Sequence, residues 1–383
     1  MDFELTKEQE DIQRAAREFA EGEFDKDLVL ELEAKGEFPW EIWKRSCKLG
    51  FVGMDFPEEY GGQGYGLFES ALVYEEFCRK AATSGMVVAG SPFGSRIILN
   101  HGSEEQKKKY LIPITRGEML SAGAFTEPDR GSDLTFLSTT ARREGKEYVI
   151  NGTKTFTTMA NSAHFIVVLC QTDPEAKPGY RGQSSIIVET NRKGVEVTKL
   201  ETMGWRTAST TQVSLIDVRV PEENLIGQEN RGFYQSLDFL NEYRALVGAI
   251  ATGIAQGAFD RALDYAKERE AFGRKISEFQ AIQHKLAEMA TKIEVARLLT
   301  YKAAWSIDRK GIDPKLCSMA KWYSARVAVE VADEAIEILG GHGYMTENEV
   351  ERFYRDARAL ELVEGTREIQ KNAIARVLLG KLK

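Results

Sequence analysis

The chain has 383 residues, which is too long for one ordinary hydrophobic core and predicts about two or three packed units. Hydrophobic residues make up 43% and charged residues 29%, the balance of a soluble globular protein. The net charge of −8 argues against a nucleic-acid-binding protein, because binding to phosphate requires a basic surface. Apolar runs long enough to span a bilayer are missing, so we expect no membrane span.

The first residues and the cysteines bear on the cellular compartment. Residues 1–7 lack the basic start and apolar stretch of a secretory signal, so we expect a cytoplasmic protein. The four cysteines are widely separated without CxxC spacing, which indicates neither a zinc site nor a disulfide framework. Reduced thiols in a cytosol are the simpler interpretation, and no metal site is predicted.

Helical periodicity covers the chain from Thr6 to about Gly117. Thr6 precedes Gln9 by three residues, which is the spacing of a helix capping box, and apolar residues follow at helical intervals. A turn-rich stretch at residues 56–64 precedes a further helix. These patterns predict an N-terminal α-helical domain, residues 1–118.

Between about Glu118 and Arg231 the apolar period changes to two, as in strands. Asn151 and Gly152 lie between two such runs and predict a hairpin turn there. Several short strands separated by Gly, Pro and Asn predict a central β domain, residues 119–231, built as a small barrel or sandwich. The expected strands include residues 148–150, 165–170, 185–188, 195–197 and 213–220.

From Gly232 the helical period returns and predicts a C-terminal helical bundle domain, residues 232–383. Apolar stripes run through residues 246–266, 282–305 and 320–339. Such stripes form the core of a bundle far more often than a cofactor site. The predicted fold class is therefore α+β, with helices, strands and helices in that order.

Glycine-rich segments give no sign of a nucleotide-binding fold of the doubly wound kind. Residues 61–66 and 340–343 lack a GxGxxG that follows a strand and opens a helix, and no P-loop is present. A nicotinamide enzyme of that fold is not expected.

Two other segments have residues suited to chemistry. Residues 124–133 combine hydroxyl groups with a Pro turn and a Gly, and such a loop can present polar groups to a flat ligand or form a plain surface turn. Glu364 follows the apolar pair Leu362 and Val363, whose burial would raise the pKa of its carboxyl group. A lone Glu is otherwise usually a solvated surface residue, and the spacing alone does not decide between these interpretations.

Together these segments resemble the acyl-CoA dehydrogenase family over essentially the whole chain. The motifs occur in the expected order at residues 124–133, 269–273, 279–280, 337–344, 350–356 and 364–366. The resemblance implies an N-terminal helical domain, a central β domain and a C-terminal four-helix bundle. It also implies flavin adenine dinucleotide (FAD) between the β domain and the bundle, and at least a dimer, most often a tetramer.

The same resemblance implies the reaction and its residues. Glu364 would be the catalytic base that removes the α proton of an acyl-CoA, while the β hydride passes to flavin N5 and a 2-enoyl-CoA forms. The implied cofactor-binding residues are Phe125, Thr126, Ser132, Phe156, Thr158, Thr366 and Glu368, together with Arg269, Phe272, Gln280, Glu337 and Gly341 from another subunit. The implied substrate-binding residues are Ser91, Ser132, Tyr243, Arg244, Val363 and Gly365.

Some relatives place the base immediately before the residue that matches Arg244. This chain has Tyr243 there, with Glu242 one residue earlier and on a different helix face, so Glu364 is the better candidate. Glu337 replaces the usual Gln, and a carboxylate cannot donate the amide hydrogen bond.

Other departures concern the substrate. Val363 replaces a frequent Tyr, which leaves room for an α-branched or alicyclic acyl group unless Tyr243 or Phe93 fills that volume. Ser84 lies near the position of the arginine found in a glutaryl-CoA relative, so a dicarboxylyl substrate is less expected, although Arg96 leaves some room.

Three alternative functions remain open at this point. The chain could be an acyl-CoA oxidase or an enoyl-CoA reductase on the same scaffold, or a non-catalytic helical scaffold protein that kept the fold. An electron-transfer flavoprotein is the electron acceptor implied by the resemblance. Flavin uptake by the purified protein would separate the enzymes from the scaffold.

Overall fold

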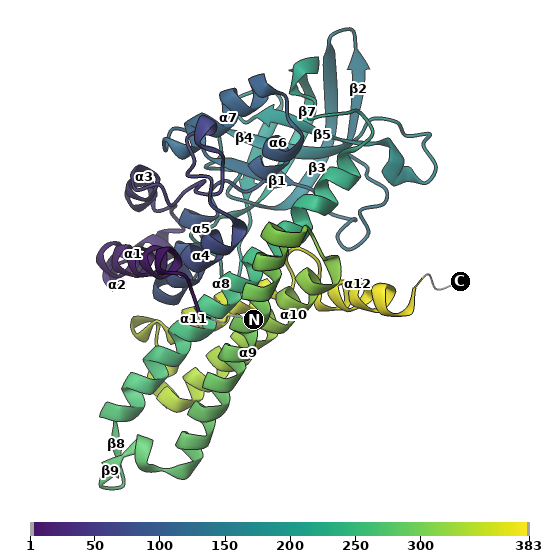
Figure 1. Ribbon diagram of the computed structural model, residues 1–383. Coiled ribbons are helices and arrows are strands. Elements are labelled where there is room, and N and C mark those ends of the chain that lie inside the picture. The colour runs from purple at the N-terminus through teal and green to yellow at the C-terminus, as the bar shows by residue number, and fades with distance from the viewer. Residues whose placement is uncertain (1–3, 381–383) are drawn as a thin grey trace.

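The computed structural model describes residues 4–380. Residues 1–3, part of the segment 1–7 on which the expectation of no secretory signal rests, lie outside that range. The N-terminal helices gather on one side of the molecule (Figure 1). They are α1 (Lys7–Glu23), α2 (Lys26–Lys35), α3 (Trp40–Lys48), α4 (Leu67–Ala81), α5 (Thr83–Ala89), α6 (Ser95–His101) and α7 (Glu104–Thr115).

The start of α1 confirms the predicted capping box. The Gln9 backbone N–H donates to Oγ1 of Thr6 at 3.3 Å, and the Thr6 backbone N–H donates to Oε1 of Gln9 at 3.0 Å. These two bonds satisfy N–H groups that would otherwise lack partners at the first turn.

The central strands form one curled, mixed sheet at the upper end of Figure 1. Its path is β1-β4-β2-β3-β7-β6, with β5 paired to β4. The β1 and β4 strands run parallel, whereas β3 and β7 form a long antiparallel pair. The strands are β1 (Ser121–Ala124), β2 (Thr140–Glu144), β3 (Glu147–Thr158), β4 (Phe165–Gln171), β5 (Gln183–Glu189), β6 (Val195–Lys199) and β7 (Thr210–Pro221).

The hairpin predicted at Asn151 and Gly152 is wrong. Both residues lie inside β3, where the register with β7 shifts between Ile150 and Gly152. Asn151 Nδ2 donates to Oδ1 of Asp217 at 3.0 Å, and the Asp217 N–H donates back to Asn151 Oδ1 at 2.9 Å. The turn between β2 and β3 lies instead at Gly145, whose φ is 65°. Pairing along the full length of β7 therefore outweighs the local turn preference of the dipeptide.

The C-terminal part of the chain contains α8 (Gly232–Glu268), α9 (Gln280–Lys310), α10 (Pro314–Leu339), α11 (Val350–Leu360) and α12 (Arg367–Leu379). The first three pack on one another, and α8 also packs on α4. The small strands β8 (Glu270–Ala271) and β9 (Arg274–Lys275) form the far tip of this bundle (Figure 1). Within residues 4–380 no helix combines the length and apolar character needed to cross a membrane. The predicted order of helices, sheet and helices is confirmed.

Residues of the 350–356 motif in α11 connect the C-terminal helices to the N-terminal helices and to the central β region. Asp356 is buried, and its Oδ1 accepts the Trp205 backbone N–H at 2.8 Å while its Oδ2 accepts the Thr83 N–H at 3.2 Å. Arg352, also buried, donates to the Ala81 carbonyl at 2.8 Å. Since α11 leads directly into the turn that carries Glu364, these contacts fix that turn relative to both other regions.

Candidate active site

Glu364 lies in the short turn between α11 and α12, and its φ is 54°. Gly365 follows with a φ of 93°, and a Cβ at this position would lie 2.7 Å from Nε2 of Gln370. Only glycine adopts such a conformation readily, and a non-glycine residue at positive φ persists only where its surroundings hold it. The turn therefore depends on the contacts around it.

Three largely or fully buried side chains hold the carbonyl groups of this turn. Arg244 Nε donates to the Glu364 carbonyl oxygen at 3.2 Å, and Gln370 Nε2 donates to the same oxygen at 2.8 Å. Lys321 Nζ donates to the Gly365 carbonyl oxygen at 2.8 Å. These side chains come from α8, α12 and α10, so the position of Glu364 is set by three helices.

The carboxyl group of Glu364 is poorly hydrated. The residue as a whole is half-buried, but its Oε2 is fully buried and has no hydrogen-bond partner. Burial raises the pKa of Glu364 to about 7, although the charges of Arg244 and then Lys321 oppose this rise. Burial also lowers the pKa of Lys321 to about 7, against the opposing charge of Glu364. A carboxyl group with such a pKa can accept and release a proton near neutral pH.

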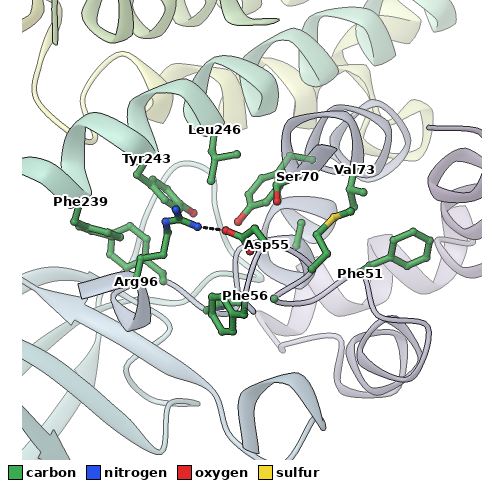
Figure 2. A pocket seen from close by; sticks show the side chains of 15 residues that line it. Phe51, Asp55, Phe56, Ser70, Val73, Arg96, Phe239, Tyr243 and Leu246 are labelled. Atoms are coloured by element: carbon green, nitrogen blue, oxygen red, sulfur yellow. Dashed lines mark hydrogen bonds and ion pairs between the residues drawn. The ribbon is translucent and has the colours of Figure 1, made fainter. Parts of the chain in front are cut away.

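An internal pocket is lined in part by α8, the helix that also carries Arg244 (Figure 2). Tyr243 of α8 lines the pocket, and its phenol pKa is raised by burial and then by the charge of Glu364. Phe93 and Phe239 line it too, with ring centroids 4.7 Å and 5.7 Å from that of Tyr243. The cavity volume is about 20 Å³, which holds roughly one water molecule.

The loop that follows β1 is fixed by a buried ion pair. Lys154 Nζ lies 3.0 Å from Oε1 of Glu127 and donates to the Phe125 carbonyl at 3.0 Å. The carboxylate of Glu127 also accepts the backbone N–H groups of Ser138 and Thr139 at 2.6 Å and 2.8 Å. A buried pair with its remaining oxygens satisfied in this way specifies one loop geometry. The ring of Phe125 then packs 5.9 Å from Phe239 on the pocket wall.

Phe156 lies at a second irregularity in β3. Its φ is 55°, the register with β7 shifts between Lys154 and Thr157, and its side chain is 66% exposed. Bulges near active sites often redirect one side chain in this way. The half-buried Thr126 and Thr158 contribute hydroxyl groups from the same domain, and Ser132 is exposed in the loop after β1.

These residues fit the chemistry of a flavin. An aromatic ring left exposed, together with hydroxyl groups, suits a flat heteroaromatic ring that carries polar edges. Thr366 Oγ1 accepts the Ile369 N–H and caps α12, and Glu368 is exposed in the first turn of that helix. Among residues 4–380, no cluster of three or more His, Cys, Asp or Glu is placed to hold a metal ion.

A second group of the expected cofactor residues lies elsewhere. Arg269 ends α8, and about 25 helical residues separate it from Arg244, which amounts to roughly 37 Å at 1.5 Å per residue. Phe272 is 96% exposed at the tip of the bundle. Gln280 is the first residue of α9. Glu337 and Gly341 are exposed at the C-terminal end of α10. The chain therefore does not bring this group together with Glu364.

The hydroxyl group of Ser91, an expected substrate contact, already has two hydrogen-bond partners within the protein. Its hydroxyl accepts the Trp43 indole N–H at 2.9 Å and donates to the Val88 carbonyl at 3.1 Å, and the residue is fully buried. Val363 packs against the main hydrophobic core. Sequence reasoning missed Lys321 and Gln370. A signal for Lys321 was available, because it lies four residues after the buried Cys317 on the apolar stripe of α10.

The fold and this site define a flavoprotein oxidoreductase. Sequence models of the N-terminal, middle and C-terminal domains of acyl-CoA dehydrogenases match residues 6–118, 122–218 and 230–379. The chain belongs to the acyl-CoA dehydrogenase family, whose members are flavin-dependent enzymes.

Individual relatives are similar over nearly their full length. The caffeyl-CoA reductase–Etf complex subunit CarC of Acetobacterium woodii is 41% identical, over 97% of this chain and 98% of its own. The short-chain-specific acyl-CoA dehydrogenase of Clostridium acetobutylicum is 39% identical, over 98% and 99%. The structure of butyryl-CoA dehydrogenase from Megasphaera elsdenii superimposes with a TM-score of 0.94 at 34% identity, covering 99% of this chain and all of the other.

Proposed function

We propose that this protein is an FAD-dependent acyl-CoA dehydrogenase in which Glu364 removes the proton α to the thioester carbonyl. The observation that carries the proposal is the buried, unpartnered Oε2 of Glu364 on a turn held by three helices. When bound, FAD supplies the acceptor for the hydride that leaves the β carbon. The product would be a 2-enoyl-CoA.

The environment of Glu364 suits the removal of a weakly acidic proton. A well-hydrated carboxylate with an ordinary pKa is too weak a base, whereas burial raises the pKa of Glu364 to about 7. The contacts from Arg244, Lys321 and Gln370 keep the backbone of the turn in place, so little reorientation is needed during proton transfer. The backbone N–H of Glu364 is the donor that we propose for the thioester oxygen.

The alternative bases on α8 are less suitable. Glu242 is ion-paired to Arg96 at 2.8 Å, so its carboxylate is already occupied. Burial, followed by the charge of Glu364, raises the pKa of the Tyr243 phenol, which keeps it protonated at neutral pH. Both observations favour Glu364.

We further propose that each cofactor site is shared between two copies of the chain. Thr126, Phe156 and Thr158, with Ser132, would hold FAD from one subunit. Arg269, Phe272, Gln280, Glu337 and Gly341 would reach it from another, since they lie at the far end of the bundle. A homotetramer provides such sites in symmetric pairs.

A second candidate function is enoyl-CoA reduction, the reverse reaction. The similarity to the reductase subunit CarC, which is named with an Etf complex, favours it. A pKa of about 7 leaves Glu364 protonated in part of the molecules at neutral pH, so the same residue can donate the α proton. An electron-transfer flavoprotein is the partner that we propose for either direction, in the cytoplasm.

We propose two arrangements of the space that would receive the acyl group. Val363 leaves space beside the α carbon, which suggests an α-branched or alicyclic acyl group. The close ring contact between Phe93 and Tyr243, 4.7 Å between centroids, supports the alternative that aromatic side chains fill this space. Arg244, Tyr243 and Gly365 are proposed substrate contacts because they adjoin the Glu364 turn.

An anaerobic titration of the purified protein with straight-chain, branched and alicyclic acyl-CoAs tests the proposal. Bleaching of the flavin absorbance by one class shows dehydrogenation and identifies the substrate group. Reoxidation of chemically reduced protein by 2-enoyl-CoAs alone would instead support the reductase. A purified protein that is colourless and takes up no FAD would contradict both functions.

A further inference from the structure

The loop between β1 and β2 contains an arginine whose charge is unpaired. Arg130 is half-buried and its Nε is fully buried, yet within residues 4–380 its side chain has no hydrogen-bond or ion-pair partner. Arg352 is the other described arginine with a buried, unbonded Nε, but that nitrogen lies 3.6 Å from Oε2 of Glu33. Buried polar groups are normally hydrogen-bonded, so the free guanidinium of Arg130 indicates a group that binds an anion.

The backbone that carries Arg130 is held in place. The Glu127 N–H donates to the Arg130 carbonyl at 2.9 Å, and the Arg130 N–H donates to the Glu127 carbonyl at 3.0 Å. The carboxylate of Glu127 is fixed in turn by the buried Lys154 and by the N–H groups of Ser138 and Thr139. Because Glu127 ties the two ends of the loop together, Arg130 needs little further ordering when it binds a ligand.

The acidic side chains of the loop do not neutralise Arg130. Asp129 and Asp133 lie in the same loop, but neither forms an ion pair with it. The pKa of Asp133 is lowered mainly by hydrogen bonds from Thr135, and the charge of Arg130 contributes least. The guanidinium lies over the exposed ring of Phe136, with 5.9 Å between its carbon and the ring centroid. Its positive charge is therefore available to a ligand.

A free guanidinium in this loop suits a phosphate group. The planar guanidinium of arginine can donate two parallel N–H groups to phosphate oxygens. Gly131 and Ser132 are exposed, and a Cβ at Gly131 would meet nothing within 4 Å, so the loop is open beside Arg130. Thr126 and Ser132, which we propose to hold FAD, belong to the same segment after β1. Both FAD and an acyl-CoA carry phosphate groups.

We infer that Arg130 is a binding residue for a nucleotide phosphate at this site. The inference rests on the proposed function and deepens it, because it names the cation that would hold one ligand by its phosphate. That phosphate belongs either to the diphosphate of FAD or to the nucleotide end of the acyl-CoA. The chemistry of recognition is the same for both, and the two ligands can be tested separately.

The test measures two affinities in Arg130→Gln. The first is the dissociation constant of FAD from the apoprotein, followed by the change in flavin fluorescence. The second is the affinity of the oxidised, flavin-loaded protein for 2-butenoyl-CoA, measured by calorimetry. This thioester is already unsaturated and does not reduce the flavin. The same titration with 2-butenoyl-pantetheine, which lacks every phosphate of CoA, isolates the contribution of the nucleotide end.

The two sources of phosphate predict different results. If Arg130 binds the diphosphate of FAD, the dissociation constant of FAD should rise at least about tenfold, with both thioesters unaffected per bound flavin. If it binds CoA, only the affinity for 2-butenoyl-CoA should fall, again at least about tenfold. Arg130→Lys keeps the charge without the planar fork, so it should show the same loss to a smaller extent and serves if Arg130→Gln does not fold.

The matched control is Arg309→Gln, which removes an exposed arginine at the end of α9 and should bind all three ligands as the wild type does. Unchanged binding of FAD and of 2-butenoyl-CoA in Arg130→Gln would overturn the inference alone. Equal weakening of the two thioesters, with FAD unaffected, would also overturn it, because the loss would not depend on phosphate. A wild type that binds neither FAD nor any acyl-CoA would overturn the proposed function.

Discussion

The ammonium group of Lys321 donates a hydrogen bond of 2.8 Å to the carbonyl oxygen of Gly365, the residue that follows Glu364 in the turn. Lys321 is fully buried, and its charge is the second of two, after that of Arg244, that lower the pKa of Glu364 against the effect of burial. A buried lysine in this place holds the turn and also tunes the carboxyl group. Because the two groups interact, they titrate as a pair rather than independently.

The first prediction concerns this pair. Deprotonated Glu364 is the base, so the rate of flavin reduction should rise with pH through about 7. Lys321→Met removes a charge that lowers the pKa of Glu364. The pH range in which the rate of flavin reduction rises should therefore move upward, and the rate at pH 7 should fall several-fold. Rapid-mixing measurements of flavin reduction across pH check this, with Lys292→Met on α9 as the control.

A purely structural role for Lys321 gives a different result. It would lower the amount of folded, flavin-loaded enzyme without moving the pH at which the rate rises. If the rate per bound flavin in Lys321→Met rises over the same pH range as in the wild type, the electrostatic role is contradicted.

The second prediction addresses the shared cofactor site. Glu364→Gln should lack the base, and Arg269→Ala should bind FAD weakly because it alters the contact made to another subunit. In a mixed assembly, the Glu364→Gln chain still supplies Arg269 to the intact Glu364 of its partner. If the two variants mix randomly in equal amounts, about half of the dimers contain one chain of each. One of the two sites in such a dimer has both residues intact, so about a quarter of all sites should be active. Activity no greater than the sum of the two separate variants would place Arg269 outside the shared site.

The third prediction concerns stability. Asp356 accepts N–H groups from Trp205 and Thr83, and Asp356→Asn turns one acceptor into a donor that faces an N–H group. We expect the free energy of unfolding to fall by about 1–3 kcal/mol. Urea or thermal denaturation measures the change, and Asp333→Asn on the exposed face of α10 is the control. Equal midpoints for the two variants would show that this junction does not stabilise the fold.

Much of the fold could be predicted from periodicity and capping. Thr6 marks the start of α1, and the runs of period two become β3 to β7. Asn151 and Gly152 were misinterpreted because the local turn preference of two residues competes with a strand pairing that sequence proximity does not reveal.

The candidate site was predictable only in part. Glu364 could be named because its motif resembles that of the family, but its turn depends on side chains from α8, α10 and α12. Lys321 sits on a buried stripe, where a cation is unusual, so helical spacing could have identified it. The ion pairs of Arg96 with Asp55 and Glu242 could not be found in this way, because these residues lie on separate elements and only the folded chain brings them together.

The most direct test of the central claim is an anaerobic titration of Glu364→Gln beside the wild type, with an acyl-CoA that bleaches the wild-type flavin. Glutamine keeps the size of the side chain but cannot accept the α proton, and loss of a general base typically slows a reaction about 10²–10⁴-fold. We predict that the variant stays yellow, binds FAD and perturbs the flavin spectrum with ligand, but is reduced at least about 100-fold more slowly. Glu58→Gln, an exposed glutamate, should behave as the wild type. Bleaching of Glu364→Gln at the wild-type rate would contradict the assignment of Glu364 as the base.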